Sequence, residues 1–370
     1  MDKKSHHIMY VSALSIIIMF ILFSCTERQN KHNVCTISID VDSIHTVEIE
    51  SKLVHELDYI DEALLYDIVD VLTYNDTLYI HSRNFLKRFE YSTGRYIGQL
   101  AETGNEEDQY SSIGRFWLDN DTFKVYDNNS GCVNFYSPAG RFLGAELPFQ
   151  HMPKFLGIQL KPNTFFDSPD GDGVYVLNQY IGSISVPTPM YTHYSDVHPS
   201  HIVEGRSSNS GAYLFDRGFS DIEHNRLLFW EALRDTLFTI KNERVEPLYA
   251  FDFGNYAFPA DKQNLSELSD RFDAFMQNED SAYVSLLRYF QSSGNYIFFS
   301  FSDNNGKIGY ARIDENNHNS SAITLVDKTN RYKPAGYIKI EGDSAMVALT
   351  DVMHPECNPA LYKFTLEVFE

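Results

Sequence analysis

Three histidines and an aspartate lie close together near the middle of the sequence, at His193, Asp196, His198 and His201. Imidazole and carboxylate groups are the usual protein ligands of zinc, so this cluster is the strongest metal candidate. Its spacing does not place two histidines on one face of a helix, and Pro199 favours a loop. We therefore expect a solvated loop here, and we predict no metal site.

Two further segments are rich in the oxygen ligands that calcium prefers, at residues 127–131 and 167–173. Neither has the EF-hand spacing with its terminal glutamate. Both contain the Asp, Asn, Ser and Gly residues that build tight turns. We expect hairpin turns at both places, and we predict no cofactor, because nothing in the sequence supports a calcium site.

Motifs of nucleophilic catalysis do not occur in the sequence. There is no Gly-x-Ser-x-Gly and no glycine-rich loop of the phosphate-binding type. We therefore predict no catalytic residues, and we favour a binding protein over an enzyme.

The weak ligand-binding candidates are Glu106, Glu107 and Tyr110, which lie in a short acidic segment. Such a segment could meet a cation or a basic partner, or it could serve solubility alone. Trp117 and Trp230 could form platforms for sugars, although a tryptophan in a strand more often belongs to the core.

The first 24 residues have the pattern of a bacterial signal peptide, with Lys3 and Lys4 before the apolar run 10–23. That run is too short to span a bilayer, which needs about 20 residues. It ends in Leu-Phe-Ser-Cys, which resembles the lipobox of bacterial lipoproteins, in which the cysteine receives a lipid. This resemblance implies that Cys25 carries a diacylglyceryl group. The protein would then be anchored in the bacterial cell envelope, on the periplasmic face or the outer-membrane surface.

Residues 25–36 are mostly polar and are expected to form a flexible tether, followed by one domain over residues 37–370. The other three cysteines are Cys35, Cys132 and Cys357, and their spacing matches no zinc motif. We expect buried thiols here rather than a disulfide.

Charge and aromatic content narrow the class of protein further. Lys and Arg number 30 against 51 Asp and Glu, which gives a formal net charge of −21. This balance argues against nucleic acid as a partner, because phosphate binding relies on clustered basic residues. The chain has 27 Phe and 24 Tyr, which favours strands over helices.

Two segments repeat each other at a spacing of 45 to 46 residues, derived from Asn75 to Asn120 and Gly94 to Gly140. In each copy an Asn-Asp turn leads to an apolar run, then to a strand, a glycine turn and the pattern Arg-aromatic-aliphatic-Gly. A unit of about 45 residues that holds four short strands is typical of a β-propeller blade.

Weaker copies follow as far as the C-terminus, and two stretches interrupt them. Residues 183–212 are expected to form a long loop. A helical insertion is expected near 261–279, with Asn264 and Glu267 as a capping box. The remaining length predicts an all-β fold, a β-propeller of about six blades with four antiparallel strands each.

At these residues the chain resembles the six-bladed β-propeller lipoproteins common in Bacteroidetes, which are similar to NHL-type propellers. The resemblance is carried by the runs 89–98 and 135–144, and by 235–238 with 247–254. In the family a Gly-x-Gly-Pro-Gly-Glu-Tyr-like loop follows the first run. Here that loop is the segment 104–110, in which only Gly104 and Tyr110 match. The resemblance implies a fold and a location rather than a reaction.

Two functions follow from this fold. The favoured one is a lipid-anchored binding or interaction module for a glycan, a peptide or a partner protein. The alternative is a metal-assisted hydrolase, lactonase or lyase, with a polar cluster drawn from several blades to the axis. Side chains about 45 residues apart meet only in space, so the sequence cannot show such a cluster.

Overall fold

A computed structural model describes most of the chain from residue 34 onward. The described residues are 34–148, 154–155, 158–159, 162–168, 173–178, 191–194, 199–203, 217–221, 226–230, 233–241, 244–263, 268–276 and 283–370. None of the helices within these ranges is long and apolar enough to cross a membrane.

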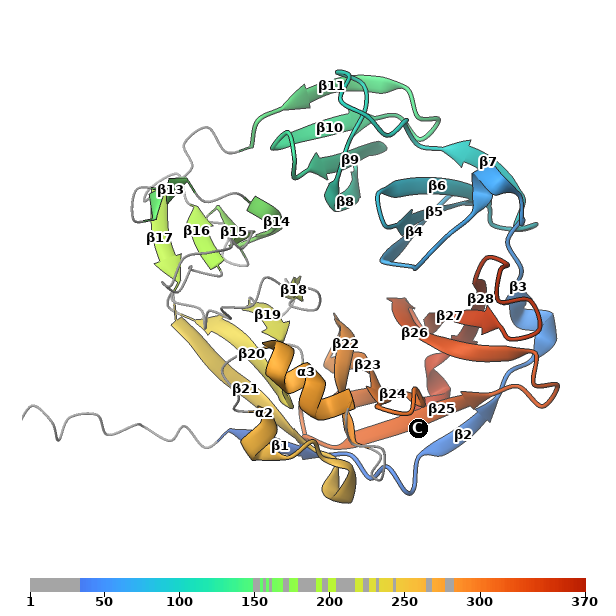
Figure 1. Cartoon of the computed structure of the whole chain (residues 1–370), viewed down its shortest axis with the longest axis vertical. Coiled ribbons are helices and arrows are strands. Elements are labelled where there is room, and N and C mark those ends of the chain that lie inside the picture. The colour runs from blue at the N-terminus through green and yellow to red at the C-terminus, as the bar shows by residue number, and fades with distance from the viewer. Residues whose placement is uncertain are drawn as a thin grey trace, which may run out of the picture. The chain divides into compact units, whose positions relative to one another are not determined.

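Six small sheets follow one another around a common axis, as Figure 1 shows, and they form a six-bladed β-propeller. In each blade the first strand lies nearest the axis and the next three follow outward as antiparallel neighbours. The first three blades contain β4 (Asp70–Tyr74), β5 (Thr77–Ser82), β6 (Phe85–Glu90) and β7 (Tyr96–Gln99); β8 (Ile113–Asp119), β9 (Thr122–Asp127), β10 (Cys132–Tyr136) and β11 (Phe142–Glu146); and β14 (Pro162–Asp167), β15 (Val174–Asn178), β16 (Tyr191–Tyr194) and β17 (Pro199–Val203).

The other three blades follow the same order. They contain β18 (Arg217–Asp221), β19 (Arg226–Trp230), β20 (Thr236–Lys241) and β21 (Arg244–Asp252); β22 (Val284–Ser293), β23 (Tyr296–Asp303), β24 (Ile308–Asp314) and β25 (Ser320–Val326); and β26 (Tyr332–Glu341), β27 (Ser344–Asp351) and β28 (Ala360–Thr365). The elements between blades are η2 (Asp61–Ala63), the pair β12 (Lys154–Phe155) and β13 (Ile158–Gln159), η3 (Gly254–Tyr256), α2 (Ala260–Gln263) and α3 (Leu268–Met276), and η4 (Leu366–Phe369) ends the chain.

The N-terminal residues 35–55, here called the strap, add one strand to each of blades 4, 5 and 6. Strand β1 (Cys35–Ser38) pairs in parallel with β21, and β2 (His45–Glu48) pairs in parallel with β25. After η1 (Ser51–Leu53), β3 (Val54–His55) pairs antiparallel with β28 and becomes the fourth strand of blade 6. The first part of the chain therefore closes a blade that the last part begins.

The repeated turn residues adopt the backbone that their types predict. Asn75 and Asn120 have φ of 52° and 47°, in the left-handed region that asparagine tolerates. Each lies in the tight turn between the first and second strands of its blade. The hairpins expected from the Asn-Asp repeats are confirmed.

The repeated glycines Gly94 and Gly140 allow the backbone of the preceding connection to lie against the turn before the fourth strand of blades 1 and 2. Gly94 has φ of 71°, and an added Cβ would lie 1.9 Å from the carbonyl oxygen of Glu56. Gly140 has φ of 89°, and its Cβ would lie 2.2 Å from the carbonyl oxygen of Leu100. Both positions need glycine for backbone conformation and for space, so the repeat encodes the contact between one blade and the next.

The core lies between neighbouring blades. In β5, Leu78 and Ile80 pack in a cluster with Met346 of blade 6, whereas Tyr79 packs with Phe123 of blade 2. Successive side chains of a strand point to opposite faces, so each central strand contributes to two clusters. Strand β23 behaves in the same way, with Ile297 and Phe299 in one cluster and Phe298 in another.

Three expectations need correction or adjustment. The long loop expected at 183–212 was wrong in part, because β16 and β17 lie within it and complete blade 3. Strand β1 begins at Cys35, two residues before the domain boundary expected at 37. The helical insertion expected near 261–279 is confirmed by α2 and α3, whereas Asn264 and Glu267 lie outside the described residues.

The three cysteines of the domain were expected to be buried. Cys35, Cys132 and Cys357 are instead half-buried free thiols.

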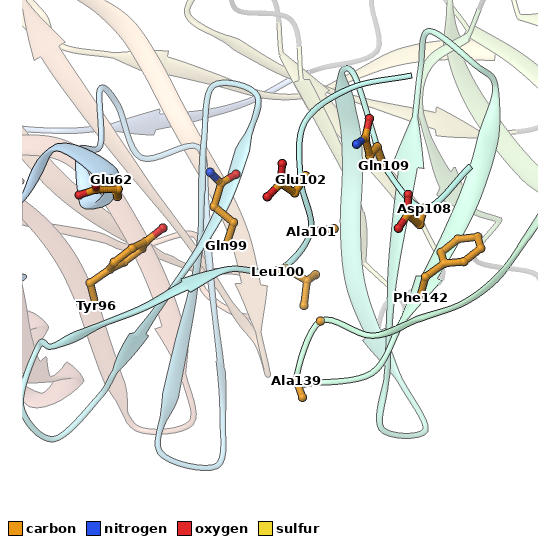
Figure 2. Close-up of a pocket in the computed structure, with 11 residues that line it drawn as sticks. Glu62, Tyr96, Gln99, Leu100, Ala101, Glu102, Asp108, Gln109, Ala139 and Phe142 are labelled. Atoms are coloured by element: carbon orange, nitrogen blue, oxygen red, sulfur yellow. The ribbon is translucent and has the colours of Figure 1, made fainter. Parts of the chain in front are cut away.

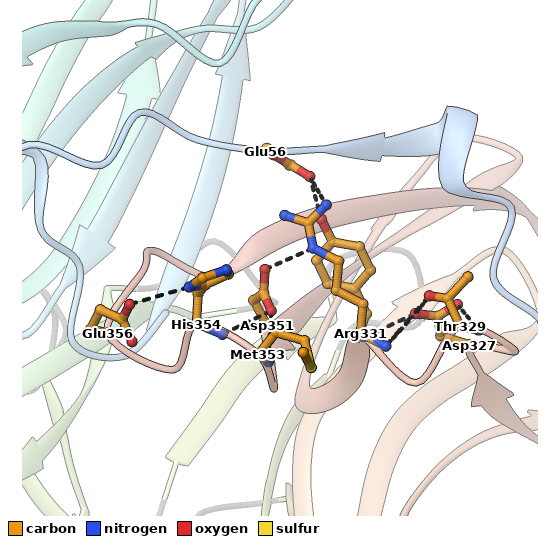
Figure 3. Close-up of polar contacts among 9 residues, drawn as sticks. Glu56, Asp327, Thr329, Arg331, Asp351, Met353, His354 and Glu356 are labelled. Carbon is orange, nitrogen blue, oxygen red and sulfur yellow. Dashed lines mark hydrogen bonds and ion pairs between the residues drawn. The ribbon is translucent and has the colours of Figure 1, made fainter.

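A polar cluster fastens the strap to blade 6 (Figure 3). Arg331 donates from Nε to Asp351 at 2.8 Å and from Nη1 to Glu56, just after β3, also at 2.8 Å. Tyr332 donates its hydroxyl to the same Glu56 carboxylate. Burial alone would raise the pKa of Asp351, but hydrogen bonds from Arg331 and from the N–H groups of Met353 and His354 lower it. The carboxylate therefore stays ionised and holds Arg331 in place.

Asn358 fastens the next part of the same connection. Its side chain is 5% exposed, accepts from the N–H of Leu65 at 2.6 Å, and donates to the carbonyls of Asp58 at 2.7 Å and Ala63 at 3.0 Å. One amide thus satisfies three backbone groups that lie about 300 positions earlier in the chain. Buried backbone groups require such partners, so this residue holds the two ends of the ring together.

Asn358→Ala should lower the free energy of unfolding by about 3 kcal/mol, because three buried backbone groups lose their partner. Urea unfolding followed by circular dichroism measures the change. The matched control is Asn305→Ala, at an exposed turn position, which should change stability by less than about 0.5 kcal/mol. Equal stability of the two variants would contradict the role of Asn358.

Gly140→Ala should destabilise the protein by about 2 kcal/mol more than Gly131→Ala. Both glycines have positive φ, so both variants carry the same kind of backbone strain. Only at Gly140 does the new Cβ meet a backbone carbonyl, whereas nothing lies within 4 Å of the Cβ position at Gly131. Melting temperatures of the two variants provide the comparison, and indistinguishable values would mean that the close approach is unimportant.

Candidate functional site

A pocket of about 370 Å³ lies beside the propeller axis, where four blades meet; we call it the axial pocket. Its walls come from the connection into blade 1, from β19 of blade 4, from β22 of blade 5, and from β26, β27 and the loop after β27 in blade 6. The lining residues are Tyr66, Asp67, Ile68, Trp230, Arg288, Tyr289, Ala335, Tyr337, Ala348, Thr350 and Pro359.

Two irregular inner strands shape this pocket. The pairing of β22 with β23 shifts between Arg288 and Gln291, and Tyr289 in this bulge has φ of 54°. The pairing of β26 with β27 shifts between Pro334 and Ile338, around Gly336 with φ of 85°. A tyrosine at positive φ is a rare and strained conformation, which costs about 1–3 kcal/mol and is concentrated at functional sites.

The two bulges bring a pair of tyrosines together at the pocket. The rings of Tyr289 and Tyr337 meet edge to face with centroids 5.2 Å apart. Tyr289 donates its hydroxyl to the carbonyl of Ile68 at 3.2 Å. The hydroxyl of Tyr337 accepts from the N–H of Val71 at 2.8 Å and lies 3.3 Å from Asp70 Oδ1. These bonds fix both rings against the segment that leads into β4.

The hydroxyl of Tyr337 in the wall is a neutral group. Burial, and then the charge of Asp70, raise the pKa of Tyr337 well above its usual value. Lys339 pairs with the same carboxylate at 3.1 Å, which balances its charge. The phenol can therefore act as a hydrogen-bonding wall but does not supply a base at neutral pH.

Trp230 forms a deeply buried wall of the pocket. It is 3% exposed, belongs to the core between blades 4 and 5, and packs against Phe290 with ring centroids 4.7 Å apart. Within the described part of the chain, its indole Nε1 has no hydrogen-bond partner. A buried donor without an acceptor costs about 1–3 kcal/mol, so this N–H is a polar group that a ligand could satisfy.

An exposed aromatic residue stands at the pocket as well. Tyr66 is 57% exposed, and the guanidinium of Arg83 lies 4.2 Å from its ring centroid. The N–H of Tyr66 donates to the buried Ser82 hydroxyl at 2.9 Å, which holds the backbone of this segment on blade 1. The pocket thus combines a rigid aromatic interior with an accessible ring.

A second pocket, of about 470 Å³, lies between blades 1 and 2, and we call it the rim pocket (Figure 2). Its lining is more acidic than that of the axial pocket, with Glu62, Glu102 and Asp108. Its remaining residues are Tyr96, Gln99, Leu100, Ala101, Gln109, Ala139, Gly140 and Phe142.

The acidic segment singled out in the sequence borders the rim pocket. Glu106 and Glu107 are exposed, whereas Tyr110 is fully buried and accepts a hydrogen bond from the N–H of Leu86 at 2.9 Å. Burial raises the pKa of Tyr110 far above its usual value. Tyr110 therefore anchors the segment 104–110 to the core of blade 1. Glu106 and Glu107 remain candidates for contact with a ligand.

Two of the four residues of the histidine cluster, His193 and His201, lie in strands rather than in a solvated loop. His193 lies in β16, is 8% exposed and stacks on Tyr175 with centroids 4.5 Å apart. It pairs across the sheet with His201 of β17. Asp196 and His198 lie outside the described residues, and no group of three or more His, Cys, Asp or Glu in the described ranges is placed to hold a metal ion.

The segment that begins at Asp127 has the structure of a turn, as expected. The Asp127 carboxylate is 3% exposed and accepts from the N–H groups of Ser111, Ser112 and Asn129. In the second segment, the N–H of Ser168 donates to the carbonyl of Gly173 at 2.9 Å, and residues 169–172 lie outside the described range.

Sequence reasoning did not find the axial pocket as a site. Trp230 was noted as a sugar platform or a core residue, and it is both a core residue and part of the pocket wall. The signal that could have pointed there is weak, because a bulge that turns Tyr289 toward positive φ has no sequence signature of its own.

Comparison with solved structures supports the fold. A candidate exported protein from Bacteroides fragilis NCTC 9343 matches 89% of this chain and 99% of its own, with a TM-score of 0.58 at 13% identity. A member of the DUF4221 family from Bacteroides vulgatus matches 85% of this chain and 95% of its own, with a TM-score of 0.52 at 10% identity. At such identities the likeness concerns the fold alone.

Sequence comparison places the chain in a family. None of the curated proteins matches it in sequence. The family DUF4934, described as a domain of unknown function, matches residues 37–352, which include almost all of the propeller. The chain therefore belongs to the DUF4934 family, here with the fold of a six-bladed β-propeller.

Proposed function

We propose that the protein is a lipid-anchored β-propeller of the cell envelope that acts as a binding module, with a sugar-like ligand in the axial pocket. The lipobox-like segment that ends at Cys25 supports the anchor. The similarity in fold to a candidate exported protein supports a location outside the cytoplasm. The ligand class follows from the chemistry of the pocket wall.

The observation that carries this proposal is the convergence of four aromatic side chains from separate parts of the ring on one pocket. Tyr66, Trp230, Tyr289 and Tyr337 all line it. Ligand pockets are typically lined by apolar and aromatic groups with a few polar atoms that fix orientation. The strained backbone at Tyr289 indicates that this arrangement is maintained at a cost to stability.

The polar atoms of the pocket narrow the class of ligand. The indole N–H of Trp230 requires an acceptor, and Asp67, Arg288 and Thr350 offer polar groups around the same space. A sugar ring carries apolar C–H faces that pack on aromatic rings, together with hydroxyls that accept and donate hydrogen bonds. A hydroxyl oxygen would supply the acceptor that Trp230 lacks.

Intrinsic fluorescence tests this proposal, because the chain has only two tryptophans, Trp117 and Trp230. A panel of neutral, amino and acidic oligosaccharides is titrated into the protein. In Trp117→Phe the remaining signal comes from the axial pocket, so a binding sugar should change the fluorescence and saturate. In Trp230→Phe the signal should stay constant, and the affinity measured by calorimetry should fall about tenfold or more.

Matched affinities in the Trp230→Phe and Trp117→Phe variants would contradict a sugar site at the axis. The proposal would also be contradicted if the wild-type protein bound none of the oligosaccharides. The melting temperature of each variant shows whether the fold is retained.

The anchor is tested separately. Cys25→Ala should move the protein from the membrane fraction to the soluble fraction of the envelope, because acyl chains supply about 0.8 kcal/mol for each buried methylene. Cys35→Ala is the matched control, since Cys35 lies in β1 of the folded domain, and it should remain in the membrane fraction. Membrane association of Cys25→Ala would overturn the lipid assignment.

A further inference from the structure

The outer edges of blades 1 and 2 are not covered by the strap, whereas those of blades 4 and 5 carry a fifth strand from it. Among the described strands, β7 and β11 are the last of their sheets, while β21 and β25 pair with β1 and β2. An edge strand presents unpaired N–H and C=O groups to its surroundings, so it is a template for another strand.

The three blades 1, 2 and 4 share one structural detail at this edge. The fourth strand of each of these blades has a bulge against its inner neighbour, and the extra residue is Ile97 in β7, Leu143 in β11 and Leu248 in β21. Leu248 is half-buried and packs against the core cluster to which Ile37 of β1 belongs. The equivalent Ile97 and Leu143 are 44% and 47% exposed.

The strap therefore shows how such an edge is occupied. In blade 4 an extended segment runs in parallel beside the strand, beginning at the residue after the bulge, and Leu248 there is less exposed than Ile97 and Leu143. In blades 1 and 2 the same aliphatic residue is exposed, with exposed Leu147 following β11 at 60%. At the start of β7 the N–H of Tyr96 already donates to Asp58 at 2.9 Å, so the edge available to a partner in blade 1 is the part after Tyr96. Burial of apolar surface contributes about 25 cal/mol for each Å², so these residues would favour a partner strand.

The charge around the two open edges determines what kind of strand would fit. Exposed carboxylates surround them, at Glu62, Glu102, Glu106, Glu107, Asp108 and Glu146. Of the nearby exposed arginines, Arg95 is paired with Glu90 at 3.3 Å, and Arg141 is the other. The protein's own strap carries Asp40 and Asp42 and would be repelled here. The complementary segment is basic.

We propose that the outer edges of blades 1 and 2 dock an extended, basic segment of a partner protein by adding it as a fifth strand. Aliphatic residues of that segment would cover Ile97 and Leu143, and its lysines or arginines would meet the carboxylates that line and border the rim pocket. This surface is separate from the axial pocket. Main-chain hydrogen bonds supply the affinity, and the charges determine the choice of partner.

A labelled peptide of about ten residues, alternating valine and lysine, is the probe, with a valine–glutamate peptide of the same length as its counterpart. Fluorescence anisotropy with the whole folded protein at low salt should show binding of the basic peptide only. Raising the salt should weaken binding about tenfold, because exposed charges are screened.

A proline in the open edge tests strand addition itself. By the alternation of the ladder, Ala145 is expected to direct its N–H away from β10, so Ala145→Pro removes a donor that a partner strand would use while leaving the blade paired. We expect about a tenfold loss of affinity, and no loss in Ala145→Val, which keeps the N–H. If the proline variant does not fold, Ile97→Lys with Leu143→Lys replaces it and should abolish binding.

A matched pair of charge variants tests the partner chemistry. Glu102→Gln with Asp108→Asn should weaken binding about tenfold. Asp270→Asn with Asp343→Asn changes the net charge equally at exposed positions in α3 and blade 6, and it should have no effect. Equal binding of the two peptides, no binding of the basic peptide, or retained affinity in a folded Ala145→Pro would each overturn the proposal.

Discussion

The junction between the last strands of the chain and its first ordered segment determines whether six separate sheets become a ring. A blade of three or four short strands cannot bury both of its faces alone, so each one depends on two neighbours. At the junction the strand pairing is short, because β3 contributes only Val54 and His55. Side chains strengthen it, since Arg331 and Tyr332 hold Glu56, and Asn358 satisfies three backbone groups of the segment 58–65. This junction therefore closes the ring, and residues on both of its sides share core clusters with blades 5 and 6.

The same geometry positions the two pockets. The segments that enter the blades are held at their ends, by Ser82 in blade 1, by Asp127 in blade 2 and by Asp351 in blade 6. The neighbouring residues that line the axial pocket and the rim pocket are therefore held in defined positions. In the axial pocket the side chains held in this way are mainly aromatic, whereas in the rim pocket they include three carboxylates. Part of the acidic excess of the chain lies around the rim pocket, at Glu62, Glu102 and Asp108.

The fold was predictable where local chemistry repeats. Asn75 with Asn120 and Gly94 with Gly140 encode the turns and the close approach between blades. These two clear copies gave the repeat length, and the chain length then predicted about six blades. Blade 3 was missed in part, because β16 and β17 lie in a segment rich in Pro, His and Ser that has no apolar alternation. The axial pocket was not predictable, because Tyr66, Trp230 and Tyr289 come together only through closure of the ring. The bulge at Tyr289 depends on its neighbours in blades 5 and 6 rather than on its own sequence.

The strap has a consequence for biosynthesis. Strands β1, β2 and β3 leave the ribosome first, yet their partners β21, β25 and β28 are among the later strands to be made. Contacts that span most of the chain form slowly, because the entropy of closing the loop must be lost before they contribute. The N-terminal residues therefore stay without their native partners until synthesis is nearly complete. The ring of six blades therefore closes only after the last strands of the chain have been made.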